Sequence, residues 1–177
     1  MKRNIIKHAS LLLMLMLSTN NALAYDFMVD SLAYNVNSDG ESVSVTYTTI
    51  SYSNNYIGLA NAIIPSSVTY YGTTYSVTSI GPFAFDGCSS LSNVSIPNSV
   101  TSIGYGAFTN CSLLTCVTIG DSVTSIAGCA FKNCSSLLSV TIPNSVISIG
   151  ESVFSGCSGL ESVVVENGNV IYDSRNN

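Results

Sequence analysis

A block of 23 residues repeats in tandem through the second half of the chain and constrains its fold more than any other feature. IGPFAFDGCSSLSNVSIPNSVTS begins at Ile80, and related blocks begin at Ile103, Ile126 and Ile149, the last of which fades near its end. No insertion interrupts the period. A fixed period of about 20–50 residues is typical of solenoids, in which each repeat forms one turn of a coil. We therefore expect a solenoid that is stabilised by the stacking of neighbouring coils.

Seven apolar positions recur in each of the first three blocks, and they indicate which side chains form the core. In the first block they are Ile80, Ala84, Phe85, Leu91, Val94, Ile96 and Val100. Val94 and Ile96 alternate with small polar residues, which predicts a short strand that ends at the corner formed by Pro97. A second short strand is expected from Val100 to Ile103. The three-residue spacing of Phe108, Cys111 and Leu114 predicts a helical or 3₁₀ turn.

The segment before the tandem blocks is a degenerate repeat that carries an insertion. IPSSVT, beginning at Ile64, matches IPNSVT at Ile96, and TYYGTTY separates it from the matching sequence VTSIG. Terminal repeats of solenoids are atypical because they close one end of the core. We expect an N-terminal β cap with this degenerate first repeat at residues 25–76, with hairpin turns at Asp39-Gly40 and within TYYGTTY. The repeat solenoid then spans residues 77–166, and residues 167–177 form a C-terminal tail that is expected to be truncated.

Residues 1–24 have the pattern of a secretory signal peptide. A basic start precedes a short apolar run, and Ala22-Leu23-Ala24 supplies small residues before a cut at Tyr25. The run is too short to span a bilayer, and no transmembrane segment follows it. Removal of the signal leaves two basic residues against ten acidic ones, a net charge of −8, which disfavours nucleic acid as a partner. We therefore expect a secreted or cell-surface protein.

The block pattern IGxxAFxxCSSLxxVxIPxSVTS resembles the BspA-like leucine-rich repeat of bacterial surface and secreted proteins. The resemblance covers Ile80 to Glu166, with departures at Gly120-Asp121, Ala127 and Ile147. It implies a right-handed, leucine-rich-repeat-like coil with a parallel strand ladder along one face. It also implies a non-enzymatic protein without a cofactor, which attaches to proteins, cells or surface glycans.

Six cysteines in an exported protein raise the question of disulfides. Four of them recur with the 23-residue period: Cys88, Cys111, Cys134 and Cys157. Stacked equivalent side chains point the same way, so we interpret these four as buried thiols that act as small apolar residues. Cys116 aligns with polar residues of the other blocks and is expected to be exposed. A row of thiols lacks the convergent geometry of a metal site.

The residue types needed for catalysis are scarce. The single histidine, His8, belongs to the signal, so a Ser-His-Asp or Cys-His arrangement cannot form in the mature chain. A carboxylate pair among Asp86, Asp121, Glu151 and Glu161 is the remaining possibility for hydrolysis, and solvated turn residues are the competing interpretation. We expect no enzymatic activity.

The outward positions of the predicted strands are the first candidate binding surface. They comprise Asn93, Ser95, Cys116, Thr118, Ser139, Thr141, Ser162 and Val164, with a second row at Thr101, Thr124 and Ile147. Small polar residues in such rows can bind a partner through many weak hydrogen bonds, or can simply permit tight coiling. A rim of tyrosines near the cap is the second candidate: Tyr70, Tyr71 and Tyr75, with Tyr52, Tyr56 and Tyr105 expected nearby.

Two functions remain after these exclusions. An exported interaction protein would bind a protein or cell-surface partner through the strand face, in the manner of an adhesin. A carbohydrate-binding surface module, which binds a cell-surface glycan, is the alternative, although the chain has no tryptophan platform. An uncapped last repeat would in addition offer an end for dimerisation.

Overall fold

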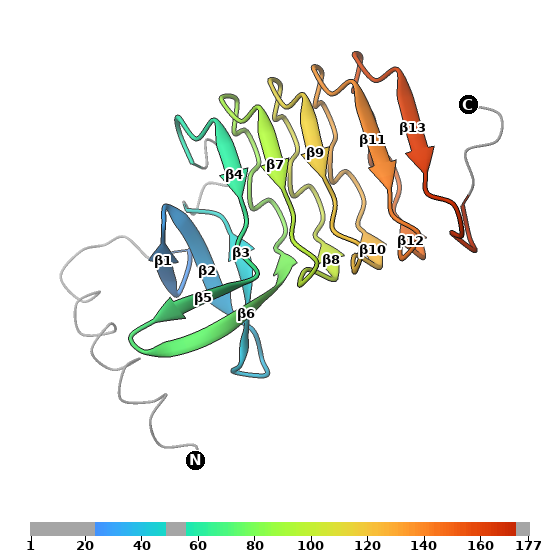
Figure 1. The fold of residues 1–177 in the computed structure, drawn as a ribbon. Helices are drawn as coiled ribbons and strands as arrows, with labels where there is room; N and C mark the ends of the chain where they lie inside the picture. The colour runs from blue at the N-terminus through green and yellow to red at the C-terminus, as the bar shows by residue number, and fades with distance from the viewer. Residues whose placement is uncertain (1–23, 49–55, 173–177) are drawn as a thin grey trace.

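A computed structural model describes residues 24–48 and 56–172. The described residues form thirteen strands and no helix. The predicted signal peptide falls, except for Ala24, outside the described residues, as do Tyr52 and the last five residues of the tail. Figure 1 shows an N-terminal group of strands at one end and a row of coils that extends from it.

The coils stack with their short strands parallel. One row holds β4 (Asn61–Ile63), β7 (Asn93–Ser95), β9 (Cys116–Thr118), β11 (Ser139–Ile142) and β13 (Ser162–Val165). A second row holds β8 (Ser102–Ile103), β10 (Ser125–Ile126) and β12 (Ser148–Ile149). Each strand of the second row pairs in parallel with its neighbour, and the paired residues are 23 apart in sequence, as in Ser125↔Ser148.

The N-terminal group continues the second row as one sheet. β1 (Phe27–Val29), β2 (Leu32–Val36) and β3 (Ser42–Thr46) pair antiparallel in order, and Asp39-Gly40 lies in the β2–β3 turn as predicted. β3 then pairs in parallel with β6 (Thr73–Ile80), and β6 with β8. The sheet order β1-β2-β3-β6-β8-β10-β12 therefore links the first coil to the antiparallel strands without a break.

The predicted TYYGTTY hairpin is present and is formed by β5 (Ser67–Tyr70) and β6. Tyr71 and Gly72 form its turn, with φ values of 47° and 79°. Asn61 of β4 pairs with Asn93 of β7, 32 residues later, so this coil is nine residues longer than those that follow. The hairpin projects from the array (Figure 1) and leaves the pairing on both sides of it intact.

The predicted apolar positions of the first three blocks are all buried. Three fully buried phenylalanines, Phe85, Phe108 and Phe131, stack in near-parallel planes with centroids 5.0 and 5.2 Å apart, and half-buried Phe154 continues the stack at 5.8 Å. Tyr56 covers the N-terminal end of this stack, 5.0 Å from Phe85. The core is thus one continuous column along the axis of the array.

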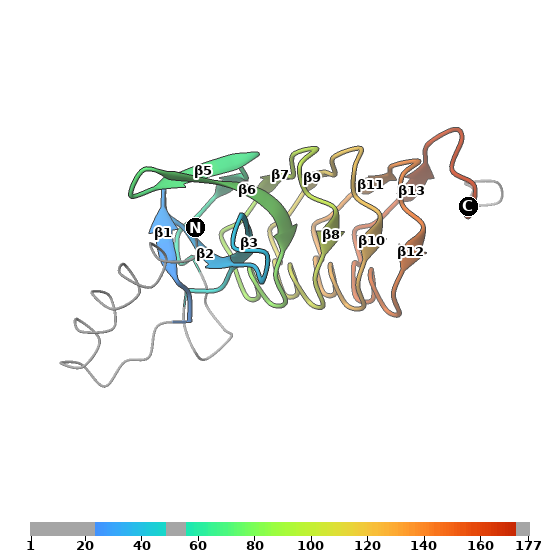
Figure 2. The same ribbon diagram turned by 90° about the horizontal axis from the view of Figure 1, so that it is seen from below.

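The segment between the second strand of one coil and the first strand of the next is not helical, so the predicted helical or 3₁₀ turn is wrong. Two of its positions adopt left-handed backbone in every coil, with φ of 54° at Phe83 and 70° at Gly87 in the first. Left-handed residues interrupt a right-handed helix. Alternate N–H groups instead donate to the next coil, as Phe85 does to the Ala107 carbonyl at 2.7 Å. We call this surface of stacked turns the turn face; Figure 2 shows it opposite the row of β7, β9, β11 and β13.

Candidate functional site

The outward side chains of the first strand row form the surface that we call the strand face. In β7, β9 and β11 the predicted positions are exposed and alternate with buried valines, which follows from the two-residue period of a strand. Ser162 and Val164 of β13 are exposed in the same way. The structure therefore brings together all the predicted residues of this surface: Asn93, Ser95, Cys116, Thr118, Ser139, Thr141, Ser162 and Val164.

Two residues of β4, Asn61 and Ile63, extend the strand face, and sequence reasoning missed them. Asn61 is level with Asn93 and Ile63 with Ser95. The nine added residues of this coil place Asn61 and Ile63 outside the 23-residue period. The alignment of IPSSVT with IPNSVT, extended backwards by three residues, nevertheless pairs Asn61 with Asn93. Ile63 is 78% exposed and Val164 46%, so apolar side chains lie at both ends of the Ser95–Thr118–Thr141 column.

The strand face is divided into two hydrogen-bonded parts. β4, β7 and β9 form one ladder, whereas β11 and β13 form another. β9 and β11 are neighbours in the row (Figure 1) and in contact, but they share no strand pairing. Strand pairing in this row is thus interrupted between the second and third blocks, whereas the second row forms a parallel ladder from β6 to β12.

Polar groups of the strand face remain available for a partner. Asn93 Nδ2 donates to Asn61 Oδ1 at 2.9 Å and to Ser92 Oγ at 3.0 Å. Within the described part of the chain, the hydroxyls of Ser95, Thr118 and Thr141 make no hydrogen bond. A hydroxyl that is exposed and unpaired can donate to or accept from a bound molecule.

The second predicted row serves the stacking of the coils. Thr101 Oγ1 donates to the Thr78 carbonyl at 3.2 Å, and Thr124 Oγ1 donates to the Thr101 carbonyl at 3.1 Å. Ile147 is exposed and replaces the hydroxyl in the next coil. Because each threonine already donates to the coil before it, this row is a weaker candidate than the strand face.

The tyrosine rim is largely part of the cap's own packing. Tyr70 stacks on Phe27 with centroids 4.4 Å apart, and Tyr75 lies 5.6 Å from the same ring. Tyr71 is 77% exposed and makes an edge contact with Tyr70. Tyr56, expected near the rim, is instead buried, and Tyr105 lies on the turn face. The rim therefore presents one exposed ring rather than a cluster.

The six cysteines are free thiols, and the four periodic ones are buried. Cys111, Cys134 and Cys157 each donate a hydrogen bond to a phenylalanine carbonyl of the preceding coil, at 3.0–3.1 Å. Hydrogen bonds to the preceding thiol, and then burial, raise the pKa of Cys134 and of Cys157. Cys116 is exposed as predicted. In the described residues, no group of three metal-ligating side chains converges on a common point.

Among the carboxylates named in the sequence, Asp86 is hydrogen-bonded to the next coil. Asp86 Oδ1 accepts a hydrogen bond from Asn110 Nδ2 at 3.0 Å, and Asn110 Oδ1 accepts one from Asn133 Nδ2 at 2.9 Å. Burial raises the pKa of Asp86. This row of one carboxylate and two amides links three coils.

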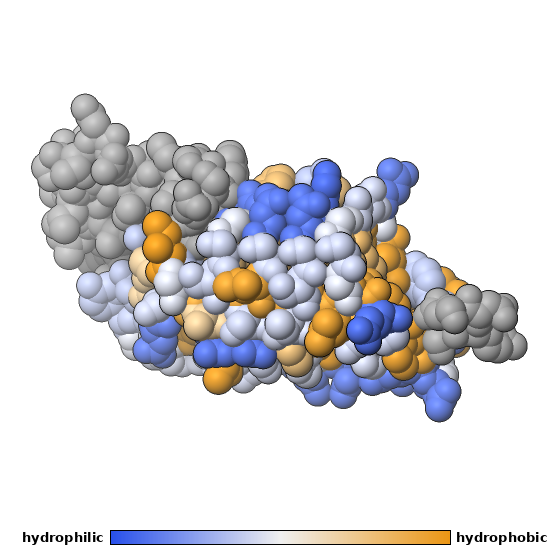
Figure 3. Space-filling model, turned by 90° about the horizontal axis from the view of Figure 1, so that it is seen from above, coloured by the Kyte–Doolittle hydropathy of each residue, from blue (hydrophilic) through white to orange (hydrophobic). Residues whose placement is uncertain are grey.

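Figure 3, a view onto the turns that precede the strands, shows bands of weakly polar side chains with separate hydrophobic spots.

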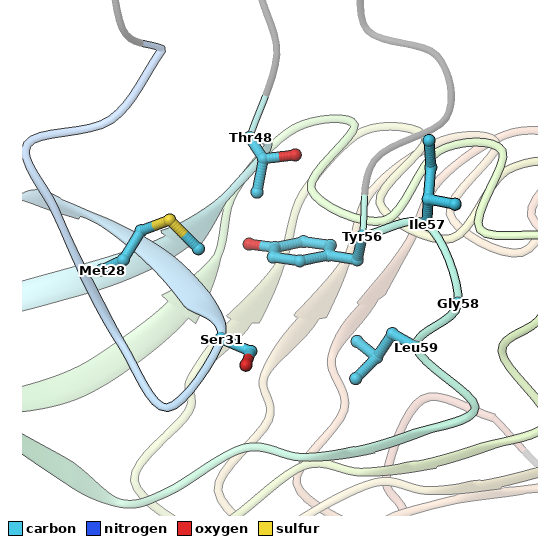
Figure 4. Close-up of a pocket in the computed structure, with 7 residues that line it drawn as sticks. All are labelled: Met28, Ser31, Thr48, Tyr56, Ile57, Gly58 and Leu59. Carbon is cyan, nitrogen blue, oxygen red and sulfur yellow. The ribbon is translucent and has the colours of Figure 1, made fainter.

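A pocket of about 470 Å³ lies in the N-terminal group of strands. Figure 4 shows the Tyr56 ring at its centre, between Met28 on one side and Leu59 on the other. The Tyr56 hydroxyl donates to the Thr46 carbonyl and accepts from the Ala33 N–H at 3.0 Å. These bonds tie the ring to the cap, so its polar group is already used.

The chain matches a known protein family. Residues 66–175 match the sequence profile of the BspA type leucine-rich repeat region, in six copies. No curated protein matches the chain. Among the described residues, no helix has the length and apolar character needed to cross a membrane.

Several solved structures of bacterial proteins are similar. A leucine-rich repeat protein from Bacteroides capillosus is 32% identical, with 80% of this chain and 98% of that one covered and a TM-score of 0.69. One from Bacteroides ovatus is 30% identical over 82% of this chain and 45% of that one, with a TM-score of 0.64. A leucine-rich cell surface protein from Faecalibacterium prausnitzii is 28% identical over 85% and 44%, with a TM-score of 0.58.

Proposed function

The chain belongs to the BspA-type leucine-rich repeat family, and from that premise we propose that it is an exported, adhesion-type interaction protein that binds a protein or cell-surface partner through its strand face. The observation that carries the proposal is the set of exposed hydroxyls of Ser95, Thr118 and Thr141, which have no hydrogen bond within the described residues. The hydroxyls of the Thr101 row, in contrast, donate to the neighbouring coil.

The chemistry of the strand face limits the kind of contact that it can make. None of its ten outward residues is charged, and Ile63 and Val164 frame the central hydroxyls. An apolar residue at each end and hydrogen-bonding groups between them suit a flat protein surface. Burial of the apolar side chains would then contribute to affinity, and the hydrogen bonds would fix the position of the partner along the strands. Binding at this surface should therefore depend only weakly on ionic strength.

The test is to place charge on the strand face. Asn93, Thr118 and Thr141 are changed together to Lys, and adhesion is measured to a panel of immobilised matrix and serum proteins and to a glycan array. Buried lysine charges are costly to desolvate, so binding to any protein that retains the wild-type chain should fall at least tenfold. Binding that is unchanged would exclude this face.

A matched control adds the same charge elsewhere. Ser90, Leu113 and Ser158 are exposed in the turns before the strands, and their replacement by Lys should leave binding intact. The alternative function, a carbohydrate-binding module, is supported by the amide and hydroxyl content of the strand face. It predicts glycan-array signals that the strand-face lysines remove, and an array without signals would exclude it.

A further inference from the structure

The turn face carries an arrangement of side chains that the strand face lacks. Tyr105, Gly128 and Glu151 occupy the same position in three successive coils: their carbonyls accept the N–H groups of the coil before, at 3.0, 3.0 and 2.9 Å. Coils that pair as neighbouring strands lie about 4.8 Å apart, so the backbones at Tyr105 and Glu151 are roughly 10 Å apart. Between them Gly128 presents no side chain.

The Tyr105 ring is held in place from several sides. Phe83 packs against it edge to face, with centroids 5.5 Å apart and planes at 72°. A Cβ atom on Gly128 would lie 3.4 Å from Tyr105 Cε2, which shows that the ring leans over this glycine. Hydrogen bonding with the neighbouring Cys129 thiol raises the pKa of Tyr105.

In spite of these contacts, half of the Tyr105 side chain is exposed. A rigid aromatic side chain with an open surface loses little conformational entropy on binding, and tyrosine is frequent among the residues that dominate interface energies. Within the described coils that follow β6, Tyr105 is the single tyrosine until the last segment, where Tyr172 is half-buried. The turn face thus has an anchor of the kind that the strand face lacks.

The negative charge of the molecule indicates which kind of ligand the Tyr105 ring attracts. Glu151 is exposed and lies one coil beyond Gly128, the glycine over which the Tyr105 ring leans. The described residues contain nine acidic side chains and one basic one, Lys132. The face of an aromatic ring attracts a cation within about 6 Å of its centroid, and a nearby carboxylate adds to that attraction. A negative molecule also steers cationic partners towards itself.

We propose that the turn face around Tyr105 is a second contact surface, which takes a lysine or arginine side chain of a protein partner between the Tyr105 ring and the Glu151 carboxylate. The partner is accordingly a basic protein surface. This surface is separate from the strand face, and the two make different demands on a partner: the turn face is sensitive to ionic strength, and the strand face is not.

The experiment uses the full chain, immobilised, and deca-lysine as the probe. Deca-lysine acetylated at all of its ε-amino groups, which removes the side-chain charges, and a neutral hexasaccharide serve as comparisons. Tyr105→Ala should weaken deca-lysine binding about three- to fivefold, the size of an exposed cation–π contact. Tyr105→Phe keeps the ring and should bind as the wild type does. Glu151→Gln should weaken binding more than Asp121→Asn, which removes one charge away from the site.

Tyr71→Ala is the matched control, because Tyr71 is the more exposed ring and lies on the cap hairpin. It should bind deca-lysine normally, and circular dichroism should show each variant folded. The proposal is overturned if the wild type does not distinguish deca-lysine from its acetylated form, or if Tyr105→Ala binds like the wild type. The other contrary result is a wild type that binds the hexasaccharide and loses this binding with Tyr105→Ala, while deca-lysine binding persists. That result would show that the ring contacts a glycan and not a basic side chain.

Discussion

Two buried tyrosines of the cap keep their phenol groups away from water. Burial, with the nearby Asp30 carboxylate, raises the pKa of Tyr34 to about 12, and burial also raises the pKa of Tyr56. Both side chains are almost inaccessible to solvent. Ionisation of either phenol would place a charge in the core next to β2, so the cap depends on both remaining neutral.

The first prediction at this scale concerns alkaline pH. The folded pKa of Tyr34 lies above the unfolded value of about 10, so the folded chain holds a proton that the unfolded chain loses between these values. The contribution of Tyr34 to the free energy of unfolding is therefore complete below pH 10 and is lost as the pH rises towards 12. The free energy of unfolding should fall by about 2–3 kcal/mol by the upper limit. Urea unfolding from pH 8 to 11.5 measures this loss.

Tyr34→Phe provides the control, since it keeps the ring and removes the titrating group. The free energy of unfolding of this variant should fall less steeply above pH 10 than that of the wild type. Parallel pH profiles for the two proteins would show that Tyr34 has no part in alkaline unfolding.

Among the elements, the stacked phenylalanines connect the coils most directly. Phe108 is fully buried between Phe85 and Phe131, whereas Phe154 is half-buried and, among the described residues, stacks on a ring on one side only. Truncation of a buried phenylalanine removes its transfer free energy and leaves a cavity. The cost of truncation should therefore depend on the position of the ring in the stack.

We predict that Phe108→Ala lowers the free energy of unfolding by about 3–5 kcal/mol. Phe154→Ala should cost clearly less, because water already reaches part of that ring. Urea titrations of both variants, compared with wild type, measure the difference. Equal losses would mean that the last coil is packed as tightly as the second, contrary to the exposure of Phe154.

The elements also show where sequence reasoning succeeds and where it stops. Val94 and Ile96 are β-branched and alternate with polar residues, so their strand and its buried face follow from local pattern. The turn face follows only in part. Left-handed backbone is favoured by residue type at one position of each coil, which holds Gly87, Asn110, Asn133 and Gly156. At Phe83 and Cys129 it accompanies hydrogen bonds to the next coil and is not indicated by residue type. The exposed residues of β7, β9 and β11 were predictable as the complement of the core. Asn61 departs from the 23-residue period because of the nine added residues, but the match of IPSSVT with IPNSVT, extended backwards, aligns it with Asn93.

At the scale of the whole molecule, order should vary along the array. Coils in the middle have a neighbour on each side, whereas Ile149, Leu160, Val163 and Val165 of the last coil are only half-buried. Asn169 and Tyr172 cover part of this end: Asn169 Nδ2 donates to the Val146 carbonyl at 2.9 Å, and Tyr172 Oη accepts from the Ile149 N–H at 3.0 Å. In repeat proteins each unit is stabilised mainly by its neighbours.

Hydrogen exchange should therefore be graded along the chain. Amides of β13 should exchange faster than those of β9 at neutral pH, because the local free energy of opening is lower where burial is incomplete. Mass spectrometry of peptides that cover residues 103–119 and 149–165 measures the gradient. Tyr172→Phe should speed exchange at Ile149 in particular, and uniform exchange over all coils would contradict a graded array.

The β5–β6 hairpin shows what the corner of a coil can accommodate. It adds nine residues between two strands whose neighbours remain in register, as Asn61↔Asn93 and Ile80↔Ile103 demonstrate. An extra loop at a corner projects into solvent and adds only a small closure entropy. Foreign peptides of similar length could accordingly be grafted between Pro97 and Val100, or at Pro143, and displayed at a spacing set by the coils, which would make the array a measuring scaffold for multivalent ligands.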